Sequence, residues 1–216
     1  MSLYHNAGIK VLVSAFGATD FPTSQGQDPT LVAQSLAAFV IANNLDGVDL
    51  DYEDNAAMNA GKGEQWICTC TNALRKLLPR PYIITHAPQG PYFMTPPTYP
   101  GGGYVAVEKT CGSAIDWYNV QFYNQDSTAY ATYTTIFQTS EGWASGTSVG
   151  EIVKKGIPAS KLVVGKGVAP GDVFNTGYVG VATFAQILKQ GVSAGYTAGF
   201  MGWQMSSDLS GAWGKA

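Results

Sequence analysis

Apolar and polar positions along the chain alternate between two patterns. Short runs rich in Val, Ile and Leu recur roughly every 35 to 45 residues, a spacing typical of strand–helix units. Gly or Pro bounds each run, so each run predicts a short buried strand. These predicted strands begin near Val11, Gly47, Tyr82, Trp117, Leu162 and Gly199.

The segments between these runs predict helices. Asp28 and Pro29 are suited to the N-cap and first position of a helix whose apolar positions continue to Val40. A second pattern, residues 64–78, places its apolar side chains on one face and ends before Pro79. Two further helical patterns, 147–155 and 183–191, each end at a glycine.

Strands that alternate with helices predict right-handed crossovers and a parallel sheet. A nucleotide-binding doubly wound sheet would carry G-x-G-x-x-G, but Pro170 stands where the third glycine after Gly165 and Gly167 belongs. Polar and aromatic residues instead follow the predicted strands, where (β/α)₈ barrels carry their chemistry. We therefore predict an α/β TIM barrel, with residues 1–216 as one catalytic domain. Only six βα units are found, so we expect a truncated barrel with exposed sheet edges.

Composition excludes some classes of function. Charged residues make up only 12% of the 216 residues and the net charge is −3, without any basic cluster of the kind that nucleic-acid binding requires. No apolar stretch is long enough for a membrane span, and no histidine or cysteine pair has metal-ligand spacing. We therefore expect no nucleic acid, membrane, metal or cofactor as a partner.

The three cysteines leave the disulfide state open. Cys111 could pair with Cys68 or with Cys70, or all three could be packed thiols. His86, beside the Pro-rich segment that follows its strand, is expected to be a hydrogen-bonded structural residue rather than a catalytic base. Residues 92–103, rich in Pro and Gly, and Tyr104 after them predict a loop.

The segment Asp46–Glu53 carries the candidate chemistry. Strand side chains alternate, so Asp49, Asp51 and Glu53 share one face. The opposite face is apolar and must meet the helices, so the three carboxylates point into the barrel. Three acids at such a site cannot all ionise cheaply, which favours a shared proton and a carboxylic acid that donates it to a leaving group. A calcium loop is the alternative, but Asp54 and Ala60 stand where such a loop needs glycine and glutamate.

DGVDLDYE, residues 46–53, is similar to the D-G-x-D-x-D-x-E signature of glycoside hydrolase family 18, the chitinases and their relatives. The other predicted strands resemble the family's strands in the same order, from KVLVSAFG as the third strand to GFMGWQM as the eighth. The segments APQ and QFYN resemble the plant class III and fungal branch. The resemblance covers the whole chain and implies that the first two βα units are the absent ones.

The resemblance implies retaining, substrate-assisted cleavage next to an N-acetylglucosamine. By this resemblance Glu53 is the general acid and base, Asp51 orients the acetamido group, and Asp49 shares a hydrogen bond with Asp51. Asp46 and Gly47 support the strand.

Further residues enter the predicted site through the same resemblance. Tyr123 would donate a hydrogen bond to the acetamido oxygen, and Trp203 would form an apolar floor under the sugar. The remaining expected substrate-binding residues are Gln121, Asn124, Phe16, Ala87, Gln89 and Met201.

The expected substrates are chitin and N-acetylglucosamine oligosaccharides. Two alternatives are an endo-β-N-acetylglucosaminidase, which cuts the chitobiose core of N-glycans, and a non-catalytic sugar-binding remnant. Open sheet edges also predict self-association. The resemblance implies a secreted protein, although the chain shows no signal peptide.

Overall fold

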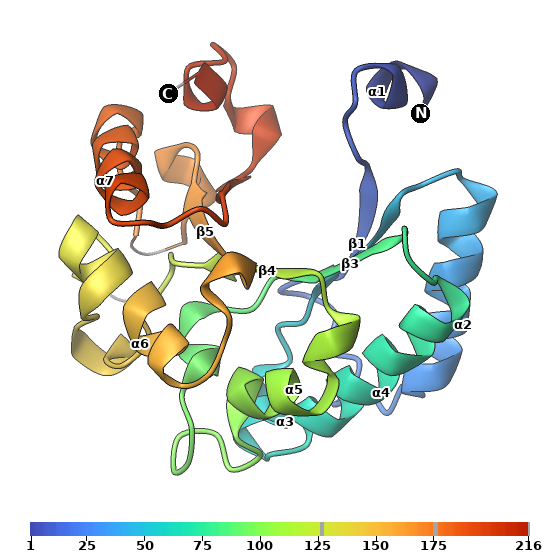
Figure 1. The fold of residues 1–216 in the computed structure, drawn as a ribbon. Coiled ribbons are helices and arrows are strands. Elements are labelled where there is room, and N and C mark those ends of the chain that lie inside the picture. Colours follow the sequence, from blue (N-terminus) through green and yellow to red (C-terminus); the bar gives the residue numbers. More distant parts are fainter. Residues whose placement is uncertain (126–127, 175–176, 216) are drawn as a thin grey trace. The chain divides into compact units, whose positions relative to one another are not determined.

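In the computed structural model, residues 1–125, 128–174 and 177–215 are described. Residues 1–88 and 94–118 form one compact unit, and residues 89–93 and 119–216 form a second, here called the first unit and the second unit. Six strands neighbour one another in the order β1-β2-β3-β4-β5-β6 (Figure 1). The paired strands run parallel, which confirms the predicted topology of six βα units.

Each strand begins at or next to its predicted residue. The strands are β1 (Leu12–Phe16), β2 (Gly47–Asp51), β3 (Ile83–His86), β4 (Trp117–Gln121), β5 (Leu162–Gly167) and β6 (Phe200–Trp203). The helices are α1 (Ser2–Asn6), α2 (Pro29–Ala42), α3 (Asn55–Asn59), α4 (Gly63–Leu77), α5 (Gly103–Cys111), α6 (Val149–Lys154) and α7 (Val181–Ser193).

The helices of the first unit form where the sequence supplies start signals and one apolar face. The Asp28 carboxylate caps α2 by accepting from the backbone N–H groups of Thr30 and Leu31, as predicted. The buried side chains Ile67 and Leu74 lie on one face of α4. Helix α4 packs against both α2 and α5, so the three helices lie side by side (Figure 1).

The predicted loop ends sooner than expected. Tyr104 lies in α5 instead of the loop, and it is fully buried together with Val107. Gly102, at φ +95°, precedes the helix and permits the turn into it. The glycines before Tyr104 have low helix propensity, so their presence predicted a loop. Burial of one face stabilises the helix instead.

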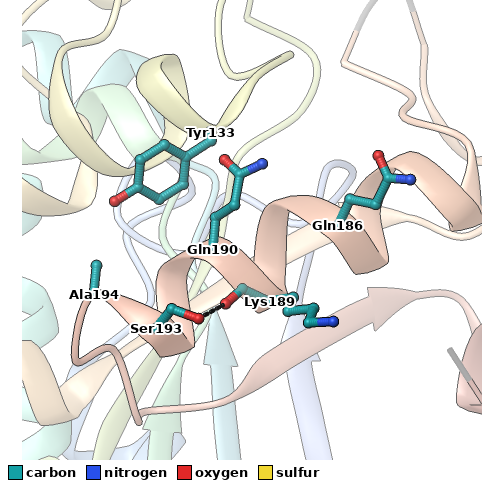
Figure 2. A pocket seen from close by; sticks show the side chains of 6 residues that line it. All are labelled: Tyr133, Gln186, Lys189, Gln190, Ser193 and Ala194. Carbon is teal, nitrogen blue, oxygen red and sulfur yellow. Dashed lines mark hydrogen bonds between the residues drawn. The ribbon is translucent and has the colours of Figure 1, made fainter.

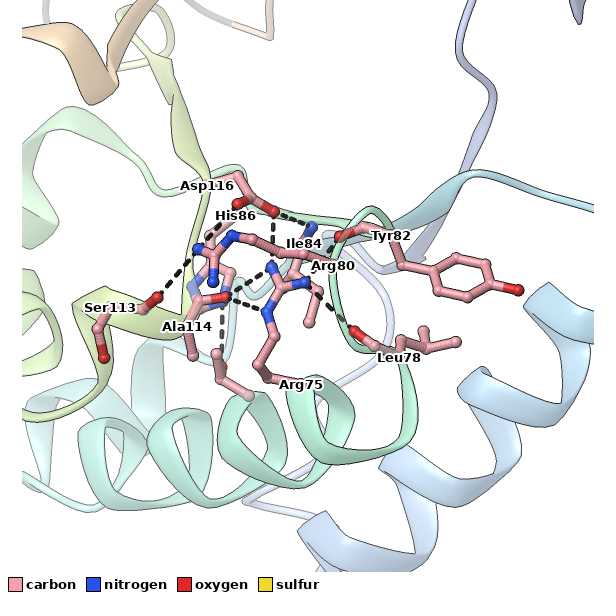
Figure 3. Close-up of polar contacts among 10 residues, drawn as sticks. Arg75, Leu78, Arg80, Tyr82, Ile84, His86, Ser113, Ala114 and Asp116 are labelled. Atoms are coloured by element: carbon pink, nitrogen blue, oxygen red, sulfur yellow. Dashed lines mark hydrogen bonds and ion pairs between the residues drawn. The ribbon is translucent and has the colours of Figure 1, made fainter.

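A partly buried guanidinium holds α4 to the starts of β3 and β4 (Figure 3). Arg75 donates to the carbonyl oxygens of Ala114 and Tyr82 at distances down to 2.7 Å, and it forms an ion pair of 2.6 Å with Asp116. The same Asp116 carboxylate accepts from the backbone N–H of Ile84 at 2.8 Å. Arg75 thus satisfies carbonyl groups at the ends of several elements and fixes where β3 begins.

A disulfide between Cys68 and Cys111 joins α4 to α5, with the two Cα atoms 5.5 Å apart. Cys70, also on α4, is a buried thiol that forms no disulfide. Burial raises the pKa of this thiol to about 12. Of the alternatives left open by the sequence, the structure therefore selects the Cys68 pairing.

We predict that Cys111→Ser lowers the free energy of unfolding by about 2–4 kcal/mol, because the bridge closes a long loop in the unfolded chain. Urea unfolding monitored by circular dichroism would measure this loss. Cys70→Ser, which changes a cysteine that forms no disulfide, is the comparison variant. Equal stability of oxidised wild type and Cys111→Ser would contradict the prediction.

The second unit is organised around a buried lysine on β5. The Lys166 side chain is fully buried, and its Nζ donates to the carbonyl oxygens of Phe122 at 2.6 Å and Tyr130 at 2.8 Å. Burial lowers the pKa of Lys166 to about 7. The amine thereby ties β5 to the segment that follows β4.

The Lys166 amine predicts a pH dependence of stability. In the unfolded chain the lysine pKa is about 10.4, so between about pH 7 and pH 10 the unfolded chain binds a proton that the folded chain does not. The contribution of Lys166 to stability therefore increases as the pH rises through this range. We expect the wild type to gain stability, relative to Lys166→Met, between pH 7 and pH 9.5 in urea unfolding. If the free energy of unfolding changed with pH in the same way for the two proteins, the prediction would be contradicted.

Candidate active site

The acidic residues of β2 lie on one face of the strand, as the alternation predicts. Asp49 and Asp51, and Glu53 two residues after the strand, are partly exposed, whereas Val48 and Leu50, which alternate with the acids, are completely buried. Tyr52 continues the buried face, and its hydroxyl forms a hydrogen bond of 2.7 Å with the Thr23 hydroxyl. The buried face anchors the strand, so the carboxylates are directed away from the helices.

Hydroxyl groups of both neighbouring strands hold Asp49 in place. The register pairs Asp49 with Ser14 on β1 and with Thr85 on β3. Ser14 Oγ donates to Asp49 Oδ2 at 3.0 Å, and Thr85 Oγ1 donates to Asp49 Oδ1 at 2.5 Å. Both carboxylate oxygens therefore have a donor from an adjacent strand, which compensates for their partial desolvation. Neither donor was predicted from the sequence.

The two residues predicted to support the strand lie at its beginning. A Cβ on Gly47 would lie 1.9 Å from the Ile83 carbonyl oxygen, so only glycine permits β3 to approach this closely. Asp46 accepts hydrogen bonds from the Val11 backbone, Lys10 and His5. Partial desolvation opposes ionisation, but these three donors together lower the pKa of Asp46 to about 2.

The end of β2 is fixed from two sides. The Gly17 backbone N–H donates to the Asp51 carbonyl oxygen at 2.8 Å. Directly after Glu53, the buried Asp54 carboxylate caps α3 and accepts from the Ser24 hydroxyl at 2.6 Å and the Ser24 backbone at 2.7 Å. Asp54 therefore holds the backbone that carries Glu53. The only sequence signal for this role of Asp54 is an acidic residue directly ahead of a short helix.

Two further predicted residues lie at the ends of the strands beside β2. The Phe16 ring, at the end of β1, packs edge-on against Trp66 with centroids 5.6 Å apart and against Tyr52 at 6.5 Å. Ala87, just after β3, is buried, and its backbone N–H donates to the Leu50 carbonyl oxygen at 3.0 Å. Both residues thus follow strands that neighbour the acidic one. His86 is completely buried against Tyr104 and Tyr118, as expected for a structural residue.

In the second unit, the predicted substrate-binding residues lie after β3, at or after the end of β4, or in β6. Gln121 ends β4, and Gln89 forms a parallel bridge with it. Tyr123 is 5% exposed, and a Cβ on Gly177 would lie 2.6 Å from the Tyr123 Cα. The Asn124 side-chain oxygen accepts from the Phe174 backbone at 2.6 Å.

The two predicted residues of β6 differ in exposure. Met201 lies against β5, since a Cβ on Gly165 would meet its methyl group at 2.6 Å. Trp203 is 46% exposed, which leaves part of the indole face accessible.

Among the described residues, no group of three or more His, Cys, Asp or Glu side chains is arranged to hold a metal ion. In the same part of the chain, no helix is long and apolar enough to cross a membrane.

The sequence profile of "Glycosyl hydrolases family 18" matches residues 2–170. The chain belongs to this family. A GH18 chitinase from Pseudoalteromonas aurantia is 35% identical to it, with a TM-score of 0.83 over 99% of this chain and 76% of that one. The six βα units are therefore those of a truncated family 18 TIM barrel, as predicted. Membership of this family indicates a protein of the glycosidase type. No curated protein sequence matches the chain.

More distant solved structures share the fold of this family 18 protein. A fungal endo-β-N-acetylglucosaminidase of family 18 is 23% identical, with a TM-score of 0.72 over 99% of this chain and 70% of that one. A variant GH18 chitinase from Cycas revoluta, solved in complex with (GlcNAc)4, is 14% identical, with a TM-score of 0.66 over 97% and 80%. At these identities the likeness concerns the fold.

The geometry around Asp49 predicts unequal effects of removing its two donors. Thr85 is 1% exposed whereas Ser14 is exposed, so Thr85→Val should lower the free energy of unfolding by about 1.5–3 kcal/mol and Ser14→Ala by less. Urea unfolding of both variants would measure the difference. In the Asp49→Asn background the Thr85→Val effect should shrink, and an unchanged effect there would contradict the contact.

Proposed function

We propose that this family 18 protein is a chitinase that hydrolyses β-1,4 linkages between N-acetylglucosamine units. The observation that carries the proposal is the row of partly exposed acids formed by Asp49 and Asp51 on β2 and Glu53 two residues after it, with Asp49 held by hydroxyl donors from both neighbouring strands. The 35% identity to the Pseudoalteromonas aurantia chitinase supports it.

In the proposed mechanism, Glu53 donates a proton to the glycosidic oxygen as the bond from that oxygen to the anomeric carbon breaks. The carbonyl oxygen of the substrate's own acetamido group attacks the anomeric carbon and forms a cyclic intermediate. Asp51 orients that acetamido group, and Asp49 shares a hydrogen bond with Asp51. The Glu53 carboxylate then accepts a proton from water as the water attacks the same carbon. The bond from that carbon to the acetamido oxygen breaks, which regenerates the acetamido group and restores the original configuration.

The proposed roles in the second unit concern substrate binding. Tyr123 donates to the acetamido oxygen, and the half-exposed Trp203 ring stacks on the apolar face of the sugar. Gln121 and Asn124 form hydrogen bonds with the sugar hydroxyls. The proposal further includes Phe16, Ala87, Gln89 and Met201 as residues that line the site, and secretion as the setting in which the protein meets chitin.

The decisive variant is Glu53→Gln, which keeps the shape of the side chain and removes its acid. We expect hydrolysis of N-acetylchitotetraose to fall by at least about a hundredfold, because proton transfer to the leaving oxygen is lost. Chromatography of the released oligosaccharides measures the rate. Glu141→Gln, a change at an exposed glutamate, is the matched control and should retain full activity.

Three other outcomes would contradict the proposal in different ways. Full activity of Glu53→Gln would exclude Glu53 as the acid. Cleavage of an N-glycan chitobiose core without cleavage of the tetrasaccharide would assign the protein as an endo-β-N-acetylglucosaminidase. Binding of the tetrasaccharide without cleavage by the wild type would assign it as a non-catalytic sugar-binding protein.

A further inference from the structure

The second unit carries a groove along α7 that none of the predicted site residues lines (Figure 2). One hollow of about 550 Å³ is lined by Tyr133, Gln186, Lys189, Gln190, Ser193 and Ala194. An adjoining hollow of about 330 Å³ shares Tyr133, Gln186 and Gln190 with the first. We call the two hollows together the Tyr133 groove. Their combined size suits a ligand of several sugar rings rather than an ion.

The aromatic ring of the groove is held in place from below. The Tyr133 ring packs on Phe137 with centroids 5.4 Å apart, and Phe137 in turn packs on Tyr196 at 5.0 Å. A Cβ on Gly191 of α7 would lie 2.7 Å from the Phe137 ring, so glycine is required for this close approach. The Tyr133 ring is thus positioned beside α7 before any ligand binds, which reduces the entropic cost of binding.

The backbone that carries Tyr133 is also fixed. The Thr132 backbone N–H donates to Thr135 Oγ1 at 2.9 Å, and the Thr135 backbone N–H donates to Thr132 Oγ1 at 3.2 Å. These reciprocal bonds hold the turn that leads into the π-helix Thr134–Gln138. Tyr133 therefore lies on a rigid element.

Amide groups face this ring from α7. Gln186 and Gln190 are one helical turn apart and both exposed, so their side chains lie on the same face of the helix. Figure 2 shows both side chains on the helix beside the Tyr133 ring. Neither side-chain amide forms a hydrogen bond with any residue that the structure describes. Each therefore offers a donor and an acceptor to a ligand.

The charges of the groove indicate the class of ligand. Among the described residues that line the two hollows, Lys189 is the one with a charged side chain, and none of them is a carboxylate. A cationic ligand would lack a counter-charge, and a polyanion would meet a single lysine. An aromatic face with amide and hydroxyl groups instead fits a neutral chain of rings that have apolar faces and carry amides.

We propose that the Tyr133 groove is a second polysaccharide-binding site that holds a chain of N-acetylhexosamine units. The Tyr133 ring stacks on the C–H face of one sugar, and the amides of Gln186 and Gln190 pair with acetamido groups along the chain. The inference rests on the proposed function, because it takes the polymer itself as the ligand. The groove keeps the protein on insoluble polymer and takes no part in bond cleavage.

Partition of the full chain onto insoluble chitin tests the groove. For Tyr133→Ala we expect the apparent Kd for chitin to rise at least about fivefold, while the hydrolysis rate of soluble N-acetylchitotetraose stays unchanged. Tyr4→Ala, a change at an exposed tyrosine of α1 outside the groove, is the control and should bind as the wild type does. Equal chitin binding by Tyr133→Ala and Tyr4→Ala would overturn the proposal.

A second variant tests the groove without changing the packed Tyr133 ring. Gln186→Ala combined with Gln190→Ala changes only exposed side chains of α7, so the fold should persist, and chitin binding should weaken about threefold or more. Unchanged binding by this variant, or equally tight binding of the wild type to cellulose, which lacks the acetamido groups, would overturn the proposal.

The same experiment separates failure of the groove from failure of the proposed function. If the wild type cleaves no tetrasaccharide, the chitinase activity is contradicted, but the partition of the variants onto chitin still decides the role of Tyr133. If the wild type cleaves the tetrasaccharide and Tyr133→Ala does so more slowly in proportion to its weaker binding, the groove is no separate site and the inference is overturned.

Discussion

The placement of Asp49 between two hydroxyl donors is the interaction on which the candidate site depends. The carboxylates of Asp49 and Asp51 on one face of β2, and of Glu53 just after it, repel one another. A strand in a parallel sheet tolerates such charges only where neighbours supply compensation. Ser14 on β1 and Thr85 on β3 supply it through the strand register, at 3.0 Å and 2.5 Å. The same register leaves Asp51, opposite Phe16 on β1, partly exposed, and Glu53, two residues after β2, is partly exposed as well.

That register in turn requires contacts at the beginnings of the strands. Gly47 permits β3 to approach β2 at the Ile83 carbonyl, where any side chain would collide with it. Asp46 attaches the segment before β1 to the start of β2, and Arg75 with Asp116 fixes the start of β3. A shift of one residue in either pairing would move the carboxylates to the apolar face. The polar contacts at the amino ends of the strands therefore maintain the site near their carboxyl ends.

Much of the fold follows from local sequence patterns. The six strands begin at or beside the predicted residues because short apolar runs between helical patterns are a local signal of buried strands. Helix α2 begins where Asp28 and Pro29 indicate. Helix α5 escaped prediction, because Gly102 and its neighbouring glycines have low helix propensity and burial of Tyr104 and Val107 stabilises the helix instead.

By itself, the sequence determined that Asp49, Asp51 and Glu53 share a face, because strand alternation is a local property with a period of two residues. Only the tertiary structure decided which side chains support them, and which cysteine pairs with Cys111. Those contacts join residues far apart in the chain, and their geometry depends on strand register and helix packing, which no local pattern encodes. The Tyr133 groove depends on tertiary structure for the same reason: α7 and Tyr133 meet only after folding.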